Sequence, residues 1–273
     1  MSKLKKNSLA LVFVICLLCV FLCGSALAEE TDNGVGYTET PVYVDGLLSC
    51  RGYMIGDDSY VSLEAACAVL GYDADVNYDK EINKLTVEVA GITIAAGFGD
   101  KYLCANGRYF YLPDGYMEVD GSFIIPTEAL AKIFTLGVSQ DDEQGAINFS
   151  TADEQILQSG DEFYNEDDLY WMSRIITWES GNQPVEGQIG VGNVILNRAG
   201  DPRFGETIKD VIFQPGQFTP ASTGAGDVIC AKLAFEGYNT VGDALFFQVG
   251  RYWGSGMIET TWLGKIGDHN FFM

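Results

Sequence analysis

The chain has 273 residues, with 47% hydrophobic and 12% aromatic residues, which excludes a disordered chain and leaves room for two packed domains. Its formal net charge of −22 excludes nucleic-acid binding through the overall electrostatic field. The composition therefore indicates an acidic, globular protein.

Residues 1–28 have the pattern of a secretory signal peptide. Three lysines precede an apolar run over residues 9–23, and Ala26-Leu27-Ala28 fits a signal-peptidase site. The apolar run is short for a stable transmembrane helix, so an uncleaved membrane anchor is the lesser alternative. Cleavage would remove three lysines and no acids, which changes the formal charge from −22 to −25. We expect a secreted protein.

Four of the seven cysteines follow this segment, namely Cys50, Cys67, Cys104 and Cys230. A disulfide is open to them outside the cell, with three complete pairings, but their spacing matches no small disulfide scaffold and no zinc motif. We expect mostly buried thiols.

Residues 29–40 are polar and contain glycine, which predicts a disordered lead-in with folded structure from about Pro41. The segment 41–150 shows an internal duplication. Residues 60–65 are similar to residues 124–129, and each segment is followed by a helical stretch (66–70, 130–134) and a strand (84–89, 146–149). The pattern predicts a duplicated β-α-β-β unit, that is, a small duplicated α/β module.

The duplicated unit resembles the copper amine oxidase N-terminal-like domain, which occurs on secreted bacterial surface proteins. The resemblance implies a non-catalytic module that contacts the wall or the cell surface, and a stalk without a ligand is the alternative. It does not imply copper, because residues 41–150 contain no histidine.

An acidic linker is predicted over residues 151–164, and seven acids without a basic residue occupy positions 153–168. A second domain is predicted over residues 165–273. Asn165 is placed to cap its first helix, with Asp168 three residues later as in a capping box.

Glu179 lies near the end of this first helix. At 100° per residue it falls within the apolar arc of Met172, Ile175 and Ile176, and Ser180-Gly181-Asn182 then stops the helix. Loss of water would raise the pKa of this carboxyl and let it donate a proton near neutrality. The alternative is a glutamate that extends into solvent.

A second helix is predicted over residues 184–198. Its three glycines, Gly187, Gly190 and Gly192, suggest a close approach of the Glu179 helix. Asn193 and Asn197 share a face of this helix, where they would form hydrogen bonds near the acid or a polar surface stripe.

The rest of the chain predicts a loop of small residues over 219–226 that would border a cleft, a helix over 227–238 and a strand over 244–249. All four tryptophans (Trp171, Trp178, Trp253 and Trp262) lie in this second domain. They are equally consistent with sugar-binding platforms and with core packing.

Several segments of the second domain resemble the SleB-type, spore-cortex-lytic cell wall hydrolases. They occur in the family's order and are WES (178–180), GQIGVGNVILNR (187–198), DPRF (201–204), VIFQ (211–214), QF (217–218), DALFF (243–247) and IGDHNFF (266–272). The resemblance implies a mainly α, lysozyme-like domain, so the whole chain is expected to be α+β. It also implies peptidoglycan glycan strands as the substrate, a role in sporulation or germination, and a cell wall or spore location.

The resemblance places Glu179 at the family's catalytic acid position. It departs from the family where Asn182-Gln183-Pro184 replaces a Gly-Glu-Pro segment, and where phenylalanines replace tyrosines on a strand. No cofactor and no metal are expected. The predicted substrate-binding residues are Gln188, Asn193, Asn197, Gln214, Phe218, Phe246, Phe247 and His269.

A glycosidase that uses water normally needs two carboxylates, and the sequence supplies no convincing partner for Glu179. One acid is sufficient for a lytic transglycosylase, in which the sugar's own 6-hydroxyl attacks the anomeric carbon. Alternatives are a hydrolytic muramidase or glucosaminidase, a decayed wall-binding protein, and a cysteine peptidase or amidase that uses Cys230 and His269.

Overall fold

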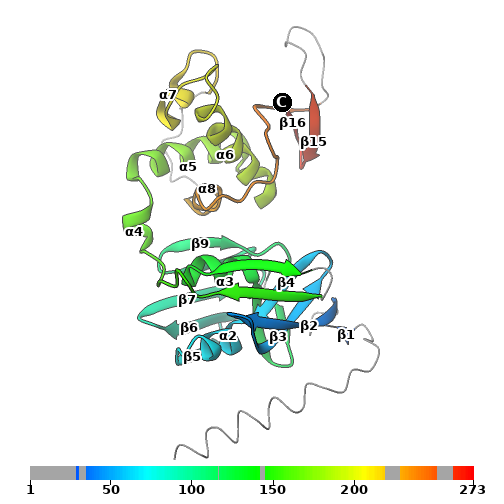
Figure 1. The fold of residues 1–273 in the computed structure, drawn as a ribbon. Helices are drawn as coiled ribbons and strands as arrows, with labels where there is room; N and C mark the ends of the chain where they lie inside the picture. The colour runs from blue at the N-terminus through cyan, green and yellow to red at the C-terminus, as the bar shows by residue number, and fades with distance from the viewer. Residues whose placement is uncertain (1–28, 31–34, 116, 142–144, 219–227, 251–260) are drawn as a thin grey trace, which may run out of the picture.

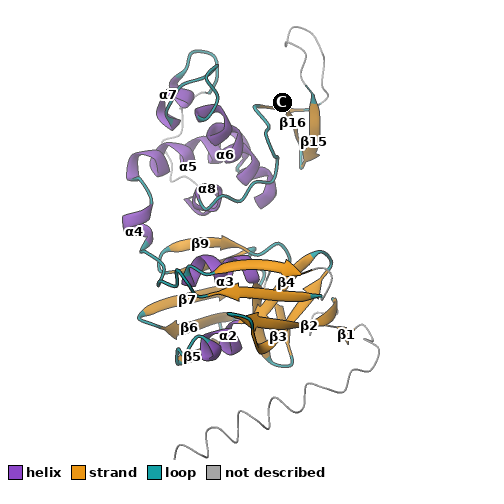
Figure 2. Cartoon of the chain, viewed as in Figure 1, coloured by secondary structure: helices purple, strands orange, loops and turns teal. Residues whose placement is uncertain are grey.

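The computed structural model describes residues 29–30, 35–115, 117–141, 145–218, 228–250 and 261–273 (Figure 1). Strands make up most of the N-terminal half and helices most of the C-terminal half, which confirms the α+β class (Figure 2). The predicted signal peptide lies outside the described residues. Within the described ranges, every helix is too short or too polar to cross a membrane.

The N-terminal half contains two sheets. The larger has eight strands: β1 (Glu29–Glu30), β2 (Gly36–Val44), β3 (Leu47–Ile55), β4 (Asp58–Ser62), β10 (Met117–Val119), β11 (Ser122–Pro126), β12 (Gly137–Asp141) and β13 (Ala146–Ser150). The smaller is an antiparallel meander of five: β5 (Ala74–Asp79), β6 (Lys84–Val89), β7 (Ile92–Gly97), β8 (Tyr102–Ala105) and β9 (Arg108–Tyr111). Two helices, α2 (Leu63–Val69) and α3 (Thr127–Phe134), pack between strands of this half.

The predicted duplication is present as two strand–helix units, β4–α2 and β11–α3. Their strands pair antiparallel within the large sheet, with Ile125 opposite Val61. The hydroxyls of Ser59 and Thr127 lie 2.6 Å apart across the pair. The duplicated segments therefore build one common core rather than two separate ones.

The expected lead-in is wrong in part, because β2 begins at Gly36 rather than near Pro41 and β1 pairs with it. Tyr37 is buried against Tyr53, with ring centroids 5.4 Å apart, so an aromatic contact holds this segment on the sheet. The polar composition of residues 29–40 gave no sign of this aromatic contact.

The C-terminal half consists of five helices and a three-stranded antiparallel sheet over the described residues. They are α4 (Gly160–Phe163), α5 (Glu166–Ser180), α6 (Val185–Ala199), α7 (Ile208–Phe213), α8 (Val228–Phe235), β14 (Phe246–Val249), β15 (Trp262–Ile266) and β16 (His269–Phe272). The core lies where α5, α6 and α8 meet (Figure 1). All of the predicted helices are present.

The acidic linker is more ordered than its composition suggested. Its acids are mostly exposed, but Leu157 is buried in the N-terminal core and its backbone N–H donates to Ile133. The Asn106 side chain donates to the carbonyl of Leu157 (2.8 Å). The chain therefore runs along the N-terminal half before α4 begins.

The β8–β9 hairpin of the N-terminal half packs against the helical core. Tyr102, Tyr109 and Tyr111 line that contact, and the Lys232 Nζ of α8 donates to the hairpin carbonyl of Gly107 (2.9 Å). The two halves therefore contact each other through apolar rings as well as through charges.

Glu236, just after α8, is the centre of this contact. Its carboxylate accepts two hydrogen bonds from Arg108 of β9 (2.7 and 2.6 Å) and one from the Tyr164 hydroxyl (2.6 Å). Lys132 of α3 donates to its backbone carbonyl (2.6 Å). The Glu236 side chain is 1% exposed and that of Arg108 13%, so water screens this ion pair little.

We predict that Arg108→Met destabilises the protein by about 3–5 kcal/mol, because it leaves the buried Glu236 carboxylate without its cation. The exposed Arg51–Glu39 pair is the control, and Arg51→Met should cost about 0–1 kcal/mol. Urea denaturation measures both. Equal effects of the two substitutions would contradict the importance of the buried pair.

Candidate active site

Glu179 lies in the last turn of α5, on the side of the helix that faces the core. It falls between the buried residues Ile175 and Met172 around the helix, and its own side chain is half-buried. Burial raises the pKa of the Glu179 carboxyl above its ordinary value. The environment inferred from the apolar arc is confirmed, and it suits a group that must carry a proton near neutrality.

Gln183, in the turn after Glu179, forms hydrogen bonds with the C-terminal hairpin made of β15 and β16. The Gln183 Oε1 accepts from the backbone N–H of Asp268 (2.7 Å), and its Nε2 donates to the Asp268 carboxylate (3.4 Å). A glutamate at this position would repel Asp268, whereas an amide both donates and accepts. The replacement of the expected glutamate by Gln183 therefore has a structural reason in this chain.

Four aromatic side chains gather between α6, α7 and β14. The rings of Phe218 and Phe247 lie 6.3 Å apart, and those of Phe204 and Phe246 lie 6.0 Å apart. The Arg198 guanidinium lies over the rings of Phe204, Phe218 and Phe246, at 5.0, 5.2 and 5.3 Å from their centroids. One cation thus joins aromatic rings from three segments.

Arg198 is buried and bonds to neutral groups of the protein. Its Nε donates to the Leu245 carbonyl (2.7 Å), and its Nη1 donates to the Gln217 amide oxygen (2.9 Å). Burial lowers its pKa to about 10. Sequence reasoning did not single out Arg198, although the helical spacing that selected Glu179 also places it on the buried face with Val191, Val194 and Ile195.

Residues 182–272 match the family model described as Cell Wall Hydrolase, and residues 47–149 match the model described as Copper amine oxidase N-terminal domain. The C-terminal half is therefore similar to cell wall hydrolases, and we call it the hydrolase domain. The family match begins three residues after Glu179, so the role of that residue rests on its geometry.

Curated relatives of the hydrolase domain are called spore cortex-lytic enzyme. The one from Oceanobacillus iheyensis is 31% identical over 118 residues, which is 40% of this chain and 42% of the relative. The one from Bacillus cereus is 30% identical over 121 residues, which is 40% of this chain and 45% of the relative. The similarity thus spans less than half of either relative.

Among solved structures, the catalytic domain of the Bacillus cereus SleB protein is 26% identical to this chain. The alignment covers 40% of this chain and 92% of that domain, with a TM-score of 0.35.

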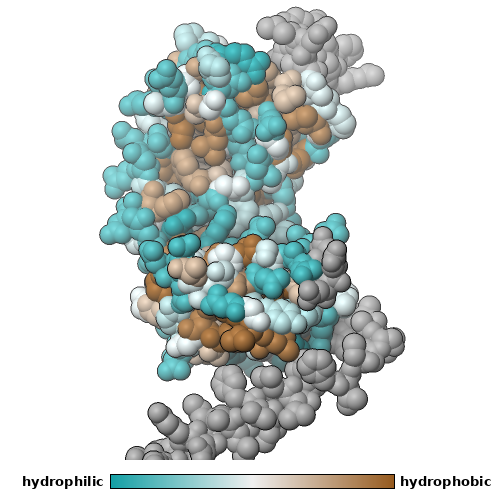
Figure 3. Space-filling model, in the orientation of Figure 1, coloured by the Kyte–Doolittle hydropathy of each residue, from teal (hydrophilic) through white to brown (hydrophobic). Residues whose placement is uncertain are grey.

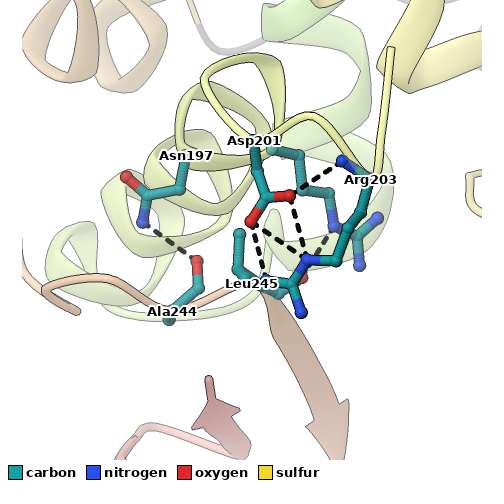
Figure 4. Close-up of polar contacts among 6 residues, drawn as sticks. Asn197, Asp201, Arg203, Ala244 and Leu245 are labelled. Carbon is teal, nitrogen blue, oxygen red and sulfur yellow. Dashed lines mark hydrogen bonds and ion pairs between the residues drawn. The ribbon is translucent and has the colours of Figure 1, made fainter.

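In the hydrolase domain, two of the predicted substrate-binding amides bond to the protein's own backbone. The Asn193 side chain donates to Tyr238 O (2.7 Å) and accepts from Thr240 N (3.0 Å). The Asn197 Nδ2 donates to the Gly242 carbonyl (2.8 Å). It also donates to the Ala244 carbonyl (2.9 Å), as Figure 4 shows. These contacts hold the segment after α8 on α6, and a contact of either residue with substrate stays a prediction.

Of the other predicted residues, Gln188 lies on α6, Gln214 follows α7 and His269 begins β16. Within the described part of the chain, Gln188 Oε1, Gln214 Oε1 and His269 Nδ1 are buried and have no hydrogen-bond partner. Burial lowers the pKa of His269, whose ring lies edge-on to Phe247 and Phe271. Phe218, Phe246 and Phe247 belong to the aromatic group around Arg198.

Two acids of the domain, Glu186 and Asp201, already form hydrogen bonds with other side chains. Burial alone would raise the pKa of Glu186, but hydrogen bonds from Lys101 and Tyr111, at 2.6 and 2.7 Å, and from its own backbone lower it. Hydrogen bonds from the side chain and backbone of Arg203 lower the pKa of Asp201 to about 2 (Figure 4). Asp243 is exposed, and Asp227 lies outside the described residues.

The described residues contain no group of three or more acids, cysteines or histidines arranged to hold a metal ion. Among the described residues, Cys50, Cys67, Cys104 and Cys230 form no disulfide; Cys67 and Cys230 are buried, and Cys50 and Cys104 are partly buried. Cys230 is 2% exposed within the core of α5, α6 and α8, which gives a nucleophile no access to substrate. The predicted cleft loop 219–226 and Trp253 lie outside the described residues.

The glycines of α6 make room mainly for elements other than α5, which corrects the expectation. A Cβ on Gly190 would lie 2.8 Å from a Val241 methyl and 2.9 Å from the Phe271 ring. Gly187 faces Ile266, and only Gly192 meets side chains of α5. The hairpin β15–β16 therefore packs against α6 at Gly190.

We predict that Gly190→Ala destabilises the hydrolase domain by about 1–3 kcal/mol through overpacking against Phe271. Gly264→Ala, where a Cβ would meet no atom within 4 Å, is the matched control and should have little effect. Thermal unfolding of the two variants gives the comparison. A neutral Gly190→Ala would show that the hairpin is not held by this contact.

Proposed function

We propose that this protein cleaves glycosidic bonds of peptidoglycan as a lytic transglycosylase, with Glu179 as the general acid and then the general base. The observation that carries the proposal is a half-buried carboxyl with a raised pKa at the end of α5, next to a matched cell wall hydrolase domain. The name of the curated relatives favours spore cortex as the form of peptidoglycan attacked.

In the proposed reaction, protonated Glu179 donates its proton to the glycosidic oxygen while the bond from that oxygen to the anomeric carbon breaks. The oxygen of the sugar's 6-hydroxyl then forms a bond to the anomeric carbon, and the Glu179 carboxylate accepts the hydroxyl proton. Glu179 ends protonated, as it began. No water is consumed, and the product is an internal 1,6-anhydro ring.

The contacts of two other acids, Glu186 and Asp201, favour a single-acid mechanism over hydrolysis. Glu186 is fixed by Lys101 and Tyr111 from the β8–β9 hairpin, and Asp201 is paired with Arg203. Neither is available to activate a water opposite Glu179, as an inverting hydrolase would require. Gln183 stands where the family's second glutamate was expected and is neutral.

We also infer export from the pattern of residues 1–28 and a wall or surface contact for the N-terminal module. A substrate made of peptidoglycan lies outside the cytoplasm, which agrees with that pattern. The docking of the β8–β9 hairpin on the hydrolase domain would then hold the domain close to the surface that the module contacts.

Glu179→Gln should abolish the clearing of purified cell walls while the fold stays intact, because glutamine cannot transfer the proton. Zymography and circular dichroism measure the two properties. Mass spectrometry of the products of the wild-type protein should show 1,6-anhydro-muramic ends. Only reducing muramic acid ends would contradict the transglycosylase form, and wall binding without clearing by the wild type would favour a decayed enzyme.

The stability of Glu179→Gln should depend on pH in a defined direction. A raised folded-state pKa stabilises the folded protein below the unfolded-state pKa, and that stabilisation is lost as the pH rises through the folded value. At about pH 8 the ionised Glu179 is costly to bury, so the glutamine variant should melt higher than the wild type, and the difference should vanish near about pH 4.

Glu186→Gln is the opposite control, because the pKa of Glu186 is lowered and its charge is stabilising at about pH 8. That variant should melt lower than the wild type. Shifts of the same sign in both variants would contradict the burial of Glu179.

A further inference from the structure

The turn that joins α5 to α6 is short and bonded to the helix that carries Glu179. It consists of residues 181–184, and we call it the α5–α6 turn. The N–H groups of Gly181 and Gln183 donate to carbonyls in the last turn of α5, at 3.0 and 2.8 Å. A displacement of the first turn of α6 is therefore passed on, through these bonds, to the last turn of α5.

The N-terminal module holds the first turn of α6 through two side-chain donors. Glu186 lies in that turn, and its Oε1 accepts from Lys101 Nζ (2.6 Å) and from the Tyr111 hydroxyl (2.7 Å). The two donors stand at the open end of the β8–β9 hairpin, where the Leu112 N–H donates to Lys101 O (2.9 Å). The strand β9 lies on the side of its half that faces the helices (Figure 1). Paired backbone thus holds both donors toward α6.

The hydrolase domain holds the same turn by contacts of its own. The Gln183 Oε1 accepts from the backbone N–H of Asp268, and the Thr240 hydroxyl donates to the Glu186 carbonyl (2.8 Å). The backbone of this region is therefore held by the hydrolase domain, and the Glu186 side chain is where the N-terminal module adds to that hold. Both added donors lie outside residues 182–272, the segment that matches the cell wall hydrolase model.

The added contacts lie at the edge of the contact between the two halves, where water reaches them. The side chains of Lys101 and Glu186 are 43% and 26% exposed. In the space-filling view the two halves touch, and many residues along their boundary are hydrophilic (Figure 3). Water screens an ion pair in such a place, so the pair contributes little to global stability. Its loss should loosen the start of α6 locally rather than unfold the protein.

We propose that Lys101 and Tyr111 are positioning residues for Glu179. They act through Glu186 and the α5–α6 turn, and the proposal rests on the proposed function. Proton transfer requires the acid within hydrogen-bond reach of the glycosidic oxygen, and a displacement of about 1 Å lowers the rate strongly. The two donors favour the turn conformation that places Glu179 correctly. Because each donor contributes little free energy, the loss of one shifts the population of that conformation only a few-fold.

The kinetics of the full chain test the proposal, with muropeptide release from soluble glycan fragments as the activity. Lys101→Met and Tyr111→Phe should each lower kcat by about 2- to 5-fold with an unchanged KM, and should lower Tm by at most about 4 °C. Lys101→Arg keeps the cation and should retain kcat. Tyr111→Phe changes no charge at pH 7, so its pH profile should keep the wild-type shape, which separates positioning from an electrostatic effect on Glu179.

Lys232→Met is the matched control. Lys232 also joins the two halves, but it donates to Gly107 at the tip of the same hairpin, away from the α5–α6 turn (2.9 Å). The substitution should leave kcat unchanged. A loss of kcat in Lys232→Met equal to that in Lys101→Met would overturn the proposal, because any weakening of the contact between the halves would then have the same effect.

Hydrogen exchange of the α5–α6 turn tests the positioning without activity. The amides of Gly181 and Gln183 should exchange faster in Lys101→Met and Tyr111→Phe than in the wild type, and at the wild-type rate in the control. Faster exchange in a protein whose wild type releases no muropeptides would contradict the proposed function alone. Unchanged exchange would overturn the positioning proposal, and so would faster exchange with an unchanged kcat.

Discussion

The packing of α6 between α5, α8 and the C-terminal hairpin is the constraint on which the proposed site depends. Gly190 and Gly192 lie on different faces of α6, where Phe271 on one side and Ala234 and Ile176 on the other come within about van der Waals distance. Because α5 is held on this helix, its last turn places Glu179 at the boundary of the core. The raised pKa of Glu179 is thus a consequence of how closely α6 is packed.

The hydrolase domain also depends on a part of the chain that does not resemble it. The β8–β9 hairpin supplies Arg108 to Glu236, and Lys101 and Tyr111 to Glu186. The first contact secures the end of α8, and the second lies at the start of α6, directly after the turn that follows Glu179. The N-terminal module therefore acts as a structural partner of the hydrolase domain, whatever else it contacts.

Much of the local structure followed from the sequence, because helices and caps are determined by neighbouring residues. The helix that ends at Glu179 was placed within a residue of α5, and the Asn165 side chain caps it by accepting from Asp168 N. The duplication was found from a few identities because both copies keep the same strand–helix turn. The resemblance of the two halves to cell wall hydrolases and to the copper amine oxidase N-terminal domain agrees with the matched family models.

The contacts between distant residues could not be predicted in the same way. Arg108 and Glu236 are 128 positions apart, and no periodicity connects them. The sequence pattern showed that Asn193 and Asn197 share one face of a helix, so they were assigned to substrate. It could not show the backbone carbonyls of a distant segment to which their amides donate. Arg198 was overlooked since its aromatic neighbours come from three separate segments of the chain.

The central claim is that Glu179 works alone, without an activated water. Cleavage of peptidoglycan in water enriched in heavy oxygen tests it most directly, because hydrolysis places one solvent oxygen on each new sugar end, whereas an intramolecular attack by the 6-hydroxyl places none. We predict products without the heavy isotope at the new muramic ends. Incorporation of one heavy oxygen per cleaved bond would contradict the single-acid mechanism and require a second carboxylate.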